Sequence, residues 1–349
     1  MIFKGWKSDL TEVISKLQKV ALGSDPIHVF VLSDRIALGL PRDRHLAGEV
    51  LKLYRPMKTQ ARLVAWCLKW LIKCGTHRVL GKKFQNEATS EITWLRNSTS
   101  VGFLGCNPSH GIRCVLLDRD KDGGLRVTKL AMGNHHESVD VEACQLEGLS
   151  GNYKGVPKLG GIERGSDWTA LWTKYFATPG PRQMDAGAVV PLLTSWLSEG
   201  FVRLGSINWL IPVFEQAPAI FSGGLKELVV RRALVHGDFA LWNLRWEGDR
   251  LMAVDWERSF EEGIAGLDLG YGMLMQFRLV AGLGGEKLID TILEKVKTPE
   301  MTRYLQKSGW KNPELLFTLV LLYDYSTTGH DVSEEVEALR IRLDGQKIN

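Results

Sequence analysis

Residues 236–243, HGDFALWN, decide the fold of this chain together with the aspartate that follows at Asp255. A short apolar run leads into Asp238, and a second apolar run ends at Asp255, twelve residues after Asn243. Two strand ends that each carry a carboxylate, with an asparagine between them, suit a divalent cation and the phosphates that it neutralises. A His-Gly-Asp-x4-Asn string arises by chance in roughly one of a thousand chains of this length.

The residue types in this segment fit the needs of phosphoryl transfer, which are an in-line hydroxyl, a proton acceptor and divalent cations. We expect Asp238 to orient the hydroxyl and take its proton. Asn243 is expected to give Mg²⁺ a neutral oxygen ligand, and Asp255 an anionic one. His236 is expected to support the loop by hydrogen bonding, because Asp238 already holds the position of the base. The alternative is that Asp238 and Asp255 only cap turns, which leaves the asparagine spacing unexplained.

Upstream of this segment the apolar pattern has a period of two with frequent glycine, which is typical of an antiparallel sheet. The order is three strands, one helix over 137–149 and two further strands. Lys129 on the third strand is expected to bind the α- and β-phosphates of a nucleotide. Glu142 on the helix is its expected partner, with Glu137 and Glu147 as competitors. The five strands are expected over residues 101–105, 112–118, 125–131, 156–162 and 168–176.

Two loops next to these strands complete the expected nucleotide site. Residues 102–111 are rich in glycine and could cover a triphosphate with backbone N–H groups. Within them Gly105 and Gly111 are candidate contacts, and Ser109 could donate to a phosphate. The last strand leads into the breaker Thr-Pro-Gly-Pro at 178–181, so the backbone near Lys174 and Tyr175 is expected to bind adenine.

The segments at 236–243 and 254–257, the latter reading Val-Asp-Trp-Glu, resemble the aminoglycoside phosphotransferase and choline kinase family over roughly residues 97–330. The resemblance implies a protein-kinase-like fold, ATP or GTP as donor, and Mg²⁺. It also implies that Asp238 is the base, that Asn243 and Asp255 hold metal, and that Asp268 is structural. Gly237 replaces an arginine of protein kinases, and only twelve residues lie between Asp255 and Asp268, so a small acceptor is favoured.

The acceptor is poorly encoded, and a sugar, glycolipid or amino-alcohol hydroxyl is the leading interpretation by analogy with the family. A cationic acceptor would need clustered carboxylates, whereas tryptophans could stack on a sugar or cage an ammonium group. Exposed charge and core packing are the respective alternatives for these residues. A catalytically silent nucleotide-binding scaffold is the alternative for the whole chain. The candidate side chains are Glu257, Glu261, Glu262, Asp324, Trp242, Trp246 and Trp256.

We therefore expect an α+β, bilobal fold in three parts. Residues 1–96 form an accessory basic region with some α/β structure, 97–178 a five-stranded antiparallel N-lobe, and 179–349 a helical C-lobe. Apolar runs at 27–32 and 36–40 could pair as a hairpin.

The N-terminal region is a separate electrostatic unit. Residues 42–83 hold eleven Lys or Arg against two acidic residues, whereas the whole chain has a net charge of only +4. A helix expected over 59–73 has apolar residues at helical spacing, among them Trp66 and Trp70. It could lie on an anionic membrane, or it could pack on the kinase lobe and expose its basic side. Nucleic-acid binding is not expected, because no recognised module is present.

Composition places the chain among ordinary globular proteins, with 44% hydrophobic and 24% charged residues in 349. No run is long enough to cross a bilayer, so the interpretation is a cytoplasmic protein that could be peripheral to the membrane. Five cysteines without metal-ligand spacing are expected to be reduced core thiols.

Overall fold

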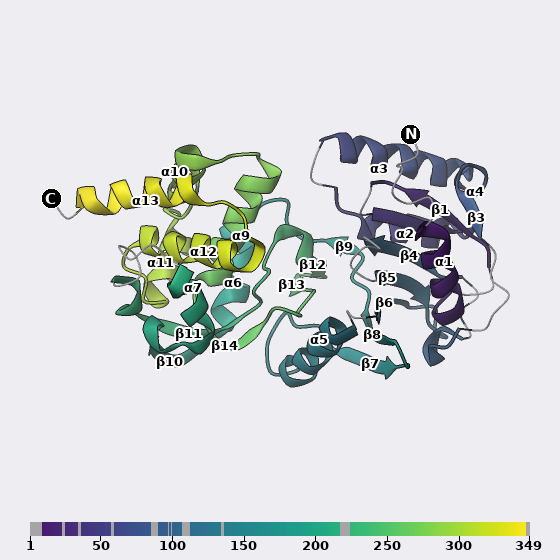
Figure 1. Cartoon of the computed structure of the whole chain (residues 1–349), viewed down its shortest axis with the longest axis horizontal. Coiled ribbons are helices and arrows are strands. Elements are labelled where there is room, and N and C mark those ends of the chain that lie inside the picture. The colour runs from purple at the N-terminus through teal and green to yellow at the C-terminus, as the bar shows by residue number, and fades with distance from the viewer. Residues whose placement is uncertain are drawn as a thin grey trace. The chain divides into compact units, whose positions relative to one another are not determined.

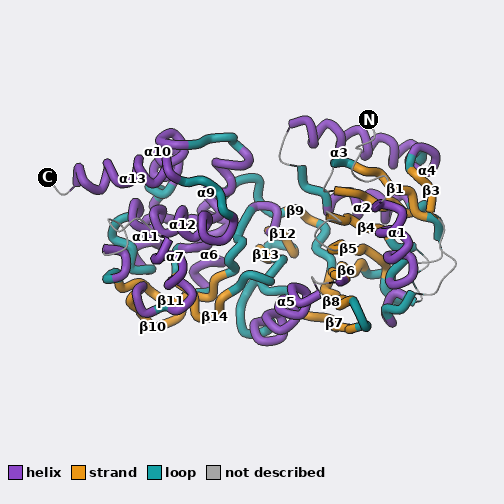
Figure 2. The backbone as a smooth tube through the Cα atoms, viewed as in Figure 1, coloured by secondary structure: helices purple, strands orange, loops and turns teal. Residues whose placement is uncertain are grey.

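A computed structural model describes residues 9–22, 25–33, 36–56, 59–84, 90–96, 98, 100–106, 112–133, 136–216 and 224–346. The chain divides into two compact units. Unit 1 consists of residues 1–150 and 157–179, and unit 2 of residues 151–156 and 180–349. Unit 1 is built around strands and unit 2 mostly from helices, as the colours of Figure 2 show. The α+β class expected from the sequence is confirmed.

Unit 1 contains one antiparallel sheet with the strand order β3-β1-β2-β4-β5-β6-β8-β7. The expected five-stranded sheet is wrong in number, because β2 pairs with β4 and brings the N-terminal hairpin into the same sheet. The backbone N–H and C=O groups along the outer edge of β4 are thereby paired with the chain's own N-terminal residues. The strands are β1 (Ile27–Val31), β2 (Ile36–Pro41), β3 (Lys82–Phe84), β4 (Gly102–Cys106), β5 (Ile112–Arg119), β6 (Leu125–Met132), β7 (Leu159–Arg164) and β8 (Trp168–Lys174).

Both faces of this sheet are covered by helices (Figure 1). Alternation along β5 and β6 puts residues such as Leu116 and Leu130 on one face, where α1 and the 3₁₀ turn η2 pack. The opposite face carries Leu117 and Val127, which pack against α2 and α3, and it also carries Lys129. The remaining elements of unit 1 are α1 (Asp9–Val20), α2 (Arg44–Leu53), α3 (Thr59–Cys74), α4 (His77–Leu80), η2 (Thr93–Leu95), α5 (His136–Leu149) and β9 (Thr178–Pro179).

Unit 2 is organised around α12, whose residues from Leu316 to Asp324 are all buried. Gly270 permits close packing of α9 on this helix, since a Cβ there would lie 2.6 Å from Val320. Helix α6 ends at Ser195, because β10 begins at Leu197 and pairs with β11. The helices are α6 (Ala186–Ser195), α7 (Ile211–Gln216), α9 (Leu267–Met275), the π-helix η8 (Gln276–Val280), α10 (Gly285–Lys295), α11 (Pro299–Lys307), α12 (Pro313–Thr328) and α13 (Ser333–Gln346). The strands are β10 (Leu197–Arg203), β11 (Val229–Val235), β12 (Leu244–Glu247), β13 (Arg250–Ala253) and β14 (Phe260–Ile264), and 3₁₀ turns lie at Leu204–Ser206, Asn208–Leu210 and Leu241–Asn243.

Two general expectations can be compared with the described residues. No helix among them is long and apolar enough to cross a membrane. Cys114 is buried, but Cys67, Cys74 and Cys144 are exposed free thiols, so the expectation of core thiols is wrong for these three. Each of the three sits on the outward side of a helix, where helical spacing alone did not identify the buried side.

Candidate active site

The loop that follows β11 is held by hydrogen bonds to the buried carboxylate of Asp268. The backbone N–H of His236 donates to its Oδ2 at 2.7 Å, and that of Gly237 donates to its Oδ1 at 3.0 Å. Asp268 lies at the start of α9 and is 3% exposed. Burial raises the pKa of Asp268 to about 7, against the two N–H donors, which lower it. The aspartate therefore fixes the loop by a local hydrogen-bond network, as a structural residue would.

His236 is fully buried, and its contacts define which ring nitrogen carries the proton. Its Nδ1 accepts from the backbone N–H of Asp238 at 3.3 Å. The other nitrogen, Nε2, lies 3.0 Å from the carbonyl oxygen of Val254 and must donate to it. A neutral Nε2–H ring satisfies both contacts. His236 thus connects the loop to the strand that leads to Asp255, which is the supporting position expected for it.

Asp238 is brought into register with Asn243 by a short 3₁₀ turn. The amide Nδ2 of Asn243 donates to the backbone carbonyl of Asp238 at 2.9 Å and to its carboxylate Oδ2 at 3.0 Å. Burial, and then the nearby charge of Asp255, raise the pKa of Asp238 to about 6, whereas Arg258 and Asn243 lower it. A carboxylate with a pKa near neutrality is matched to accepting a proton from a hydroxyl and releasing it again.

Asp255 has an unusual backbone conformation. Among the described residues it is the non-glycine residue with positive φ, at 78°. Such a conformation costs about 1–3 kcal/mol and is typical of functional sites. The bend places the carboxylate directly after a strand that is tied to Asn243, whose carbonyl accepts from the N–H of Val254 at 2.8 Å. Gly237 also needs its glycine, since φ is 78° and a Cβ would lie 2.2 Å from the carbonyl oxygen of Arg258.

The donor set of this loop fits a hard divalent cation. Because Nδ2 of Asn243 uses its hydrogens on Asp238, the side-chain Oδ1 is oriented as an acceptor, and Asp255 adds an anionic oxygen. The described residues contain no group of three or more His, Cys, Asp or Glu that could hold a metal. A Mg²⁺ ion held by Asn243 and Asp255 would complete its shell with phosphate and water oxygens, as is usual for this ion.

In unit 1, Lys129 and Glu142 form an ion pair. The Lys129 ammonium lies 2.7 Å and 2.5 Å from the two carboxylate oxygens of Glu142. The Glu142 side chain is 4% exposed and the Lys129 side chain 21%. Glu137 and Glu147 are exposed on α5, so the choice among the three glutamates was correct. A phosphate-binding role for Lys129 remains a prediction.

The rest of the expected nucleotide site is only partly visible. Gly105 lies in β4, whereas Ser109 and Gly111 fall outside the described residues. Lys174 ends β8, and the N–H of Tyr175 donates to the carbonyl of Leu125 at 3.1 Å, within the sheet. That N–H is therefore engaged within the sheet and is not available to a nucleotide base. The backbone contact expected from Tyr175 would have to come from its carbonyl or from the residues after it.

Helix α2 lies on the same face of the sheet as Lys129. The Tyr175 hydroxyl donates to the Glu49 carboxylate of this helix at 3.1 Å, and Val127, two residues before Lys129, packs against the α2–α3 cluster. Part of the apolar surface next to the lysine is thus covered by the N-terminal region. Nothing in the sequence pattern indicated this contact, which joins residues 126 positions apart.

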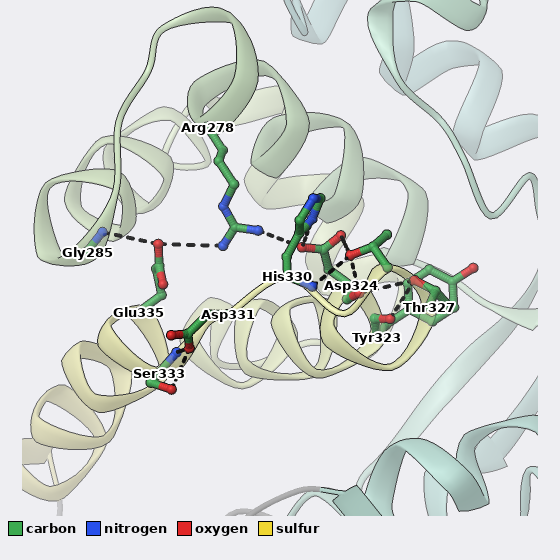
Figure 3. A network of polar contacts seen from close by, with 10 residues as sticks. Arg278, Gly285, Tyr323, Asp324, Thr327, His330, Asp331, Ser333 and Glu335 are labelled. Carbon is green, nitrogen blue, oxygen red and sulfur yellow. Dashed lines mark hydrogen bonds and ion pairs between the residues drawn. The ribbon is translucent and has the colours of Figure 1, made fainter. Parts of the chain in front are cut away.

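Three of the residues considered for the acceptor have other partners in the structure. Trp256 is fully buried against His236 and Trp196, at ring-centroid distances of 4.7 and 5.4 Å, so it is a core residue. Asp324 is also fully buried and binds Arg278 at 2.6 Å (Figure 3). The exposed Glu262 binds Arg232 at 2.6 Å. The stacking and acceptor interpretations therefore fail for Trp256 and lose support for Asp324.

Two tyrosines that the sequence did not indicate lie next to the loop at 236–243. The hydroxyl of Tyr323, on α12, donates to the carbonyl of Gly237 at 3.1 Å. Tyr271, on α9, packs edge-on against Tyr323, and burial followed by the charge of Asp238 raises its pKa. Only the register of two distant helices brings them there, so no local motif could have found them.

No protein-family model matches the chain, and no curated protein matches it. Similar solved structures include aminoglycoside phosphotransferases and proteins provisionally assigned as fructosamine-3-kinases. An aminoglycoside phosphotransferase from Streptomyces rimosus, solved with ADP and streptomycin, matches 61% of this chain and 90% of its own at 15% identity and a TM-score of 0.41. A Haemophilus somnus protein, provisionally assigned as a fructosamine-3-kinase, matches 66% and 88% at 13% identity and a TM-score of 0.40. Likeness this distant does not define an activity.

Proposed function

We propose that this chain is a phosphotransferase that moves the γ-phosphoryl group of ATP, or GTP, to a hydroxyl of a small acceptor. The observation that supports it most is the placement of Asp238. Its carboxylate is held by Asn243, its backbone N–H by the neutral ring of His236, and its pKa is raised to about 6 beside Asp255. A turn-capping aspartate would need none of these contacts.

The chemistry follows from these positions. Asp238 orients the acceptor hydroxyl and takes its proton as the oxygen–phosphorus bond forms, while the bond from the γ-phosphorus to the bridging oxygen breaks and the nucleoside diphosphate leaves. Asn243 and Asp255 would hold Mg²⁺, which when bound neutralises charge on the phosphates. Lys129, kept in place by Glu142, contributes a cation for the α- and β-phosphates. His236 and Asp268 position the loop without touching substrate.

The same proposal covers the chemical class of the acceptor. A sugar, a glycolipid headgroup or an amino alcohol fits a loop in which only twelve residues separate Asp255 from Asp268. That length leaves no room for a segment that could bind an extended peptide.

A second candidate is a catalytically silent nucleotide-binding scaffold, recruited to a membrane or a partner by its basic N-terminal region. The packing of α2 over part of the Lys129 face favours it, because this helix limits the surface on which a nucleotide could lie. The intact set of Asp238, Asn243 and Asp255 argues against it.

One experiment separates the two candidates. Nucleoside diphosphate release would be measured with Mg²⁺ against panels of aminoglycosides, sugars, amino alcohols and glycolipids, for the wild type, Asp238→Asn and Asp255→Asn. We expect acceptor-dependent turnover that both substitutions remove, while Asp238→Asn keeps nucleotide binding by calorimetry. Tight Mg²⁺-dependent binding without turnover on any panel would support the scaffold. Absence of nucleotide binding would exclude both.

A further inference from the structure

Helix α3 packs against the rest of unit 1 through a narrow strip of its surface. Of its sixteen residues only Leu68 and Ile72, one turn apart, are buried. With 3.6 residues per turn, positions 63, 66 and 70 fall on the opposite side of the helix. The helix therefore packs on unit 1 through Leu68 and Ile72, and it exposes apolar as well as basic residues.

Large apolar side chains are concentrated on this exposed side. Leu63 is 61% exposed, Trp66 58% and Trp70 56%, and in α4 Val79 and Leu80 are 82% and 64% exposed. Six of the thirteen exposed large hydrophobic residues recorded for the described parts of the chain lie between positions 63 and 80. Single exposed apolar residues are normal, but a cluster of this kind marks an interaction surface.

The charges around the cluster have one sign. From Val50 to Asn86 the sequence holds nine Lys or Arg and no Asp or Glu. Arg62, Lys69 and Lys73 are exposed on α3 and fall together along one flank of the tryptophan stripe. Long basic side chains beside exposed tryptophan suit a boundary between hydrocarbon and anionic headgroups, because their stems can extend over apolar surface while the charge stays in water.

We propose that this cluster, the α3 surface (Arg62, Leu63, Trp66, Lys69, Trp70, Lys73, Val79 and Leu80), docks the protein on an anionic phospholipid membrane. The helix would lie in the plane of the interface with Leu63, Trp66 and Trp70 inserted and the basic flank on the headgroups.

Two other occupants fit the surface less well. Protein interfaces are depleted in lysine around their aromatic residues, whereas this surface is rimmed by it. Single-stranded nucleic acid stacks its bases on aromatic rings, but Leu63, Val79 and Leu80 offer no ring to stack on. A membrane interface accommodates the aliphatic, indole and basic side chains together.

The test is co-sedimentation of the full chain with phosphatidylcholine vesicles, with and without phosphatidylglycerol, at low and physiological salt. We expect binding only with phosphatidylglycerol, weakened by salt. Lys69→Glu/Lys73→Glu should reduce partitioning by about twentyfold or more, since each basic residue near an anionic surface contributes roughly fivefold. Trp66→Ser/Trp70→Ser should abolish vesicle binding, because the two indole rings that insert into the membrane are lost.

The matched control is Arg303→Glu/Lys307→Glu on α11, which has the same spacing, exposure and change of charge. It should bind vesicles within about twofold of the wild type, apart from the general effect of net charge. Absence of binding to phosphatidylglycerol vesicles at low salt would overturn the proposal, as would an equal loss in this control. A single-stranded oligonucleotide that displaces the protein from the vesicles at a concentration below that of the lipid would assign the surface to nucleic acid. This result would overturn the proposal as well.

Discussion

The segment 236–255 in unit 2 and the segment 59–80 in unit 1 both carry tryptophan among charged residues, yet they are built in opposite ways. In the first, polar groups are inside: His236 is fully buried, Asn243 nearly so, and each has defined hydrogen-bond partners. In the second, apolar groups are outside, with Trp66 and Trp70 each more than half exposed. Buried polar groups and exposed apolar groups are both costly, and both are therefore signs of function.

The largest effect is expected from Asp238→Asn, which removes the proton acceptor but keeps its shape. We expect kcat/KM to fall by about 10²–10⁴-fold, the usual contribution of a general base. The measurement is acceptor-dependent release of nucleoside diphosphate. A fall of less than tenfold would mean that Asp238 is not the proton acceptor and that the buried polar segment only stabilises the fold.

The same variant should be more stable than the wild type at pH 8. The folded pKa of about 6 lies above the ordinary 3.8, so ionised Asp238 destabilises the folded state by up to about 3 kcal/mol. Below both pKa values the carboxyl is protonated in both states and the difference vanishes. Urea unfolding at pH 8 and pH 3 measures this, and equal stabilities at pH 8 would contradict it.

The two tryptophan environments can be compared directly. Trp256→Ala should lower the free energy of unfolding by about 3–5 kcal/mol, because the fully buried ring packs on His236 and Trp196. Trp70→Ala should change it by less than about 0.5 kcal/mol. Chemical denaturation of both variants gives the result. Similar losses would mean that α3 packs more tightly than its exposure indicates.

The pH dependence of the reaction should reflect the raised pKa of Asp238. Because the carboxylate form accepts the proton, we expect kcat/KM to be level above pH 7 and to fall tenfold per pH unit below about 6. The residual rate of Asp238→Asn should lack this inflection. A wild-type profile that stays level down to pH 5 would exclude Asp238 as the base.

The smallest effect is expected from Tyr175→Phe in unit 1. The variant loses the bond from its hydroxyl to Glu49 and should be less stable by about 1 kcal/mol. Thermal unfolding measures the change, and Tyr325→Phe, an exposed tyrosine of α12, serves as a control that should leave the melting temperature unaltered. No destabilisation would mean that α2 is only loosely held on the Lys129 face.

Much of the strand order and the Lys129–Glu142 pair could be predicted from the sequence, because period-two runs and the offset from strand to helix are local features. Other contacts join residues far apart in the chain. The pairing of β2 with β4 that enlarges the sheet, the Tyr323 bond to Gly237, and the Arg278–Asp324 pair all depend on how complete elements pack. No spacing rule reaches across such distances.

By itself the sequence determined the chemical inventory of residues 236–255 and the basic character of residues 42–83. Both follow from residue types that lie close together along the chain. Only the tertiary structure decided which side of α3 faces water and which carboxylates are engaged elsewhere. A helix with apolar residues around much of its circumference can bury any of several sides, and packing against the sheet selects Leu68 and Ile72 and leaves Trp66 and Trp70 exposed.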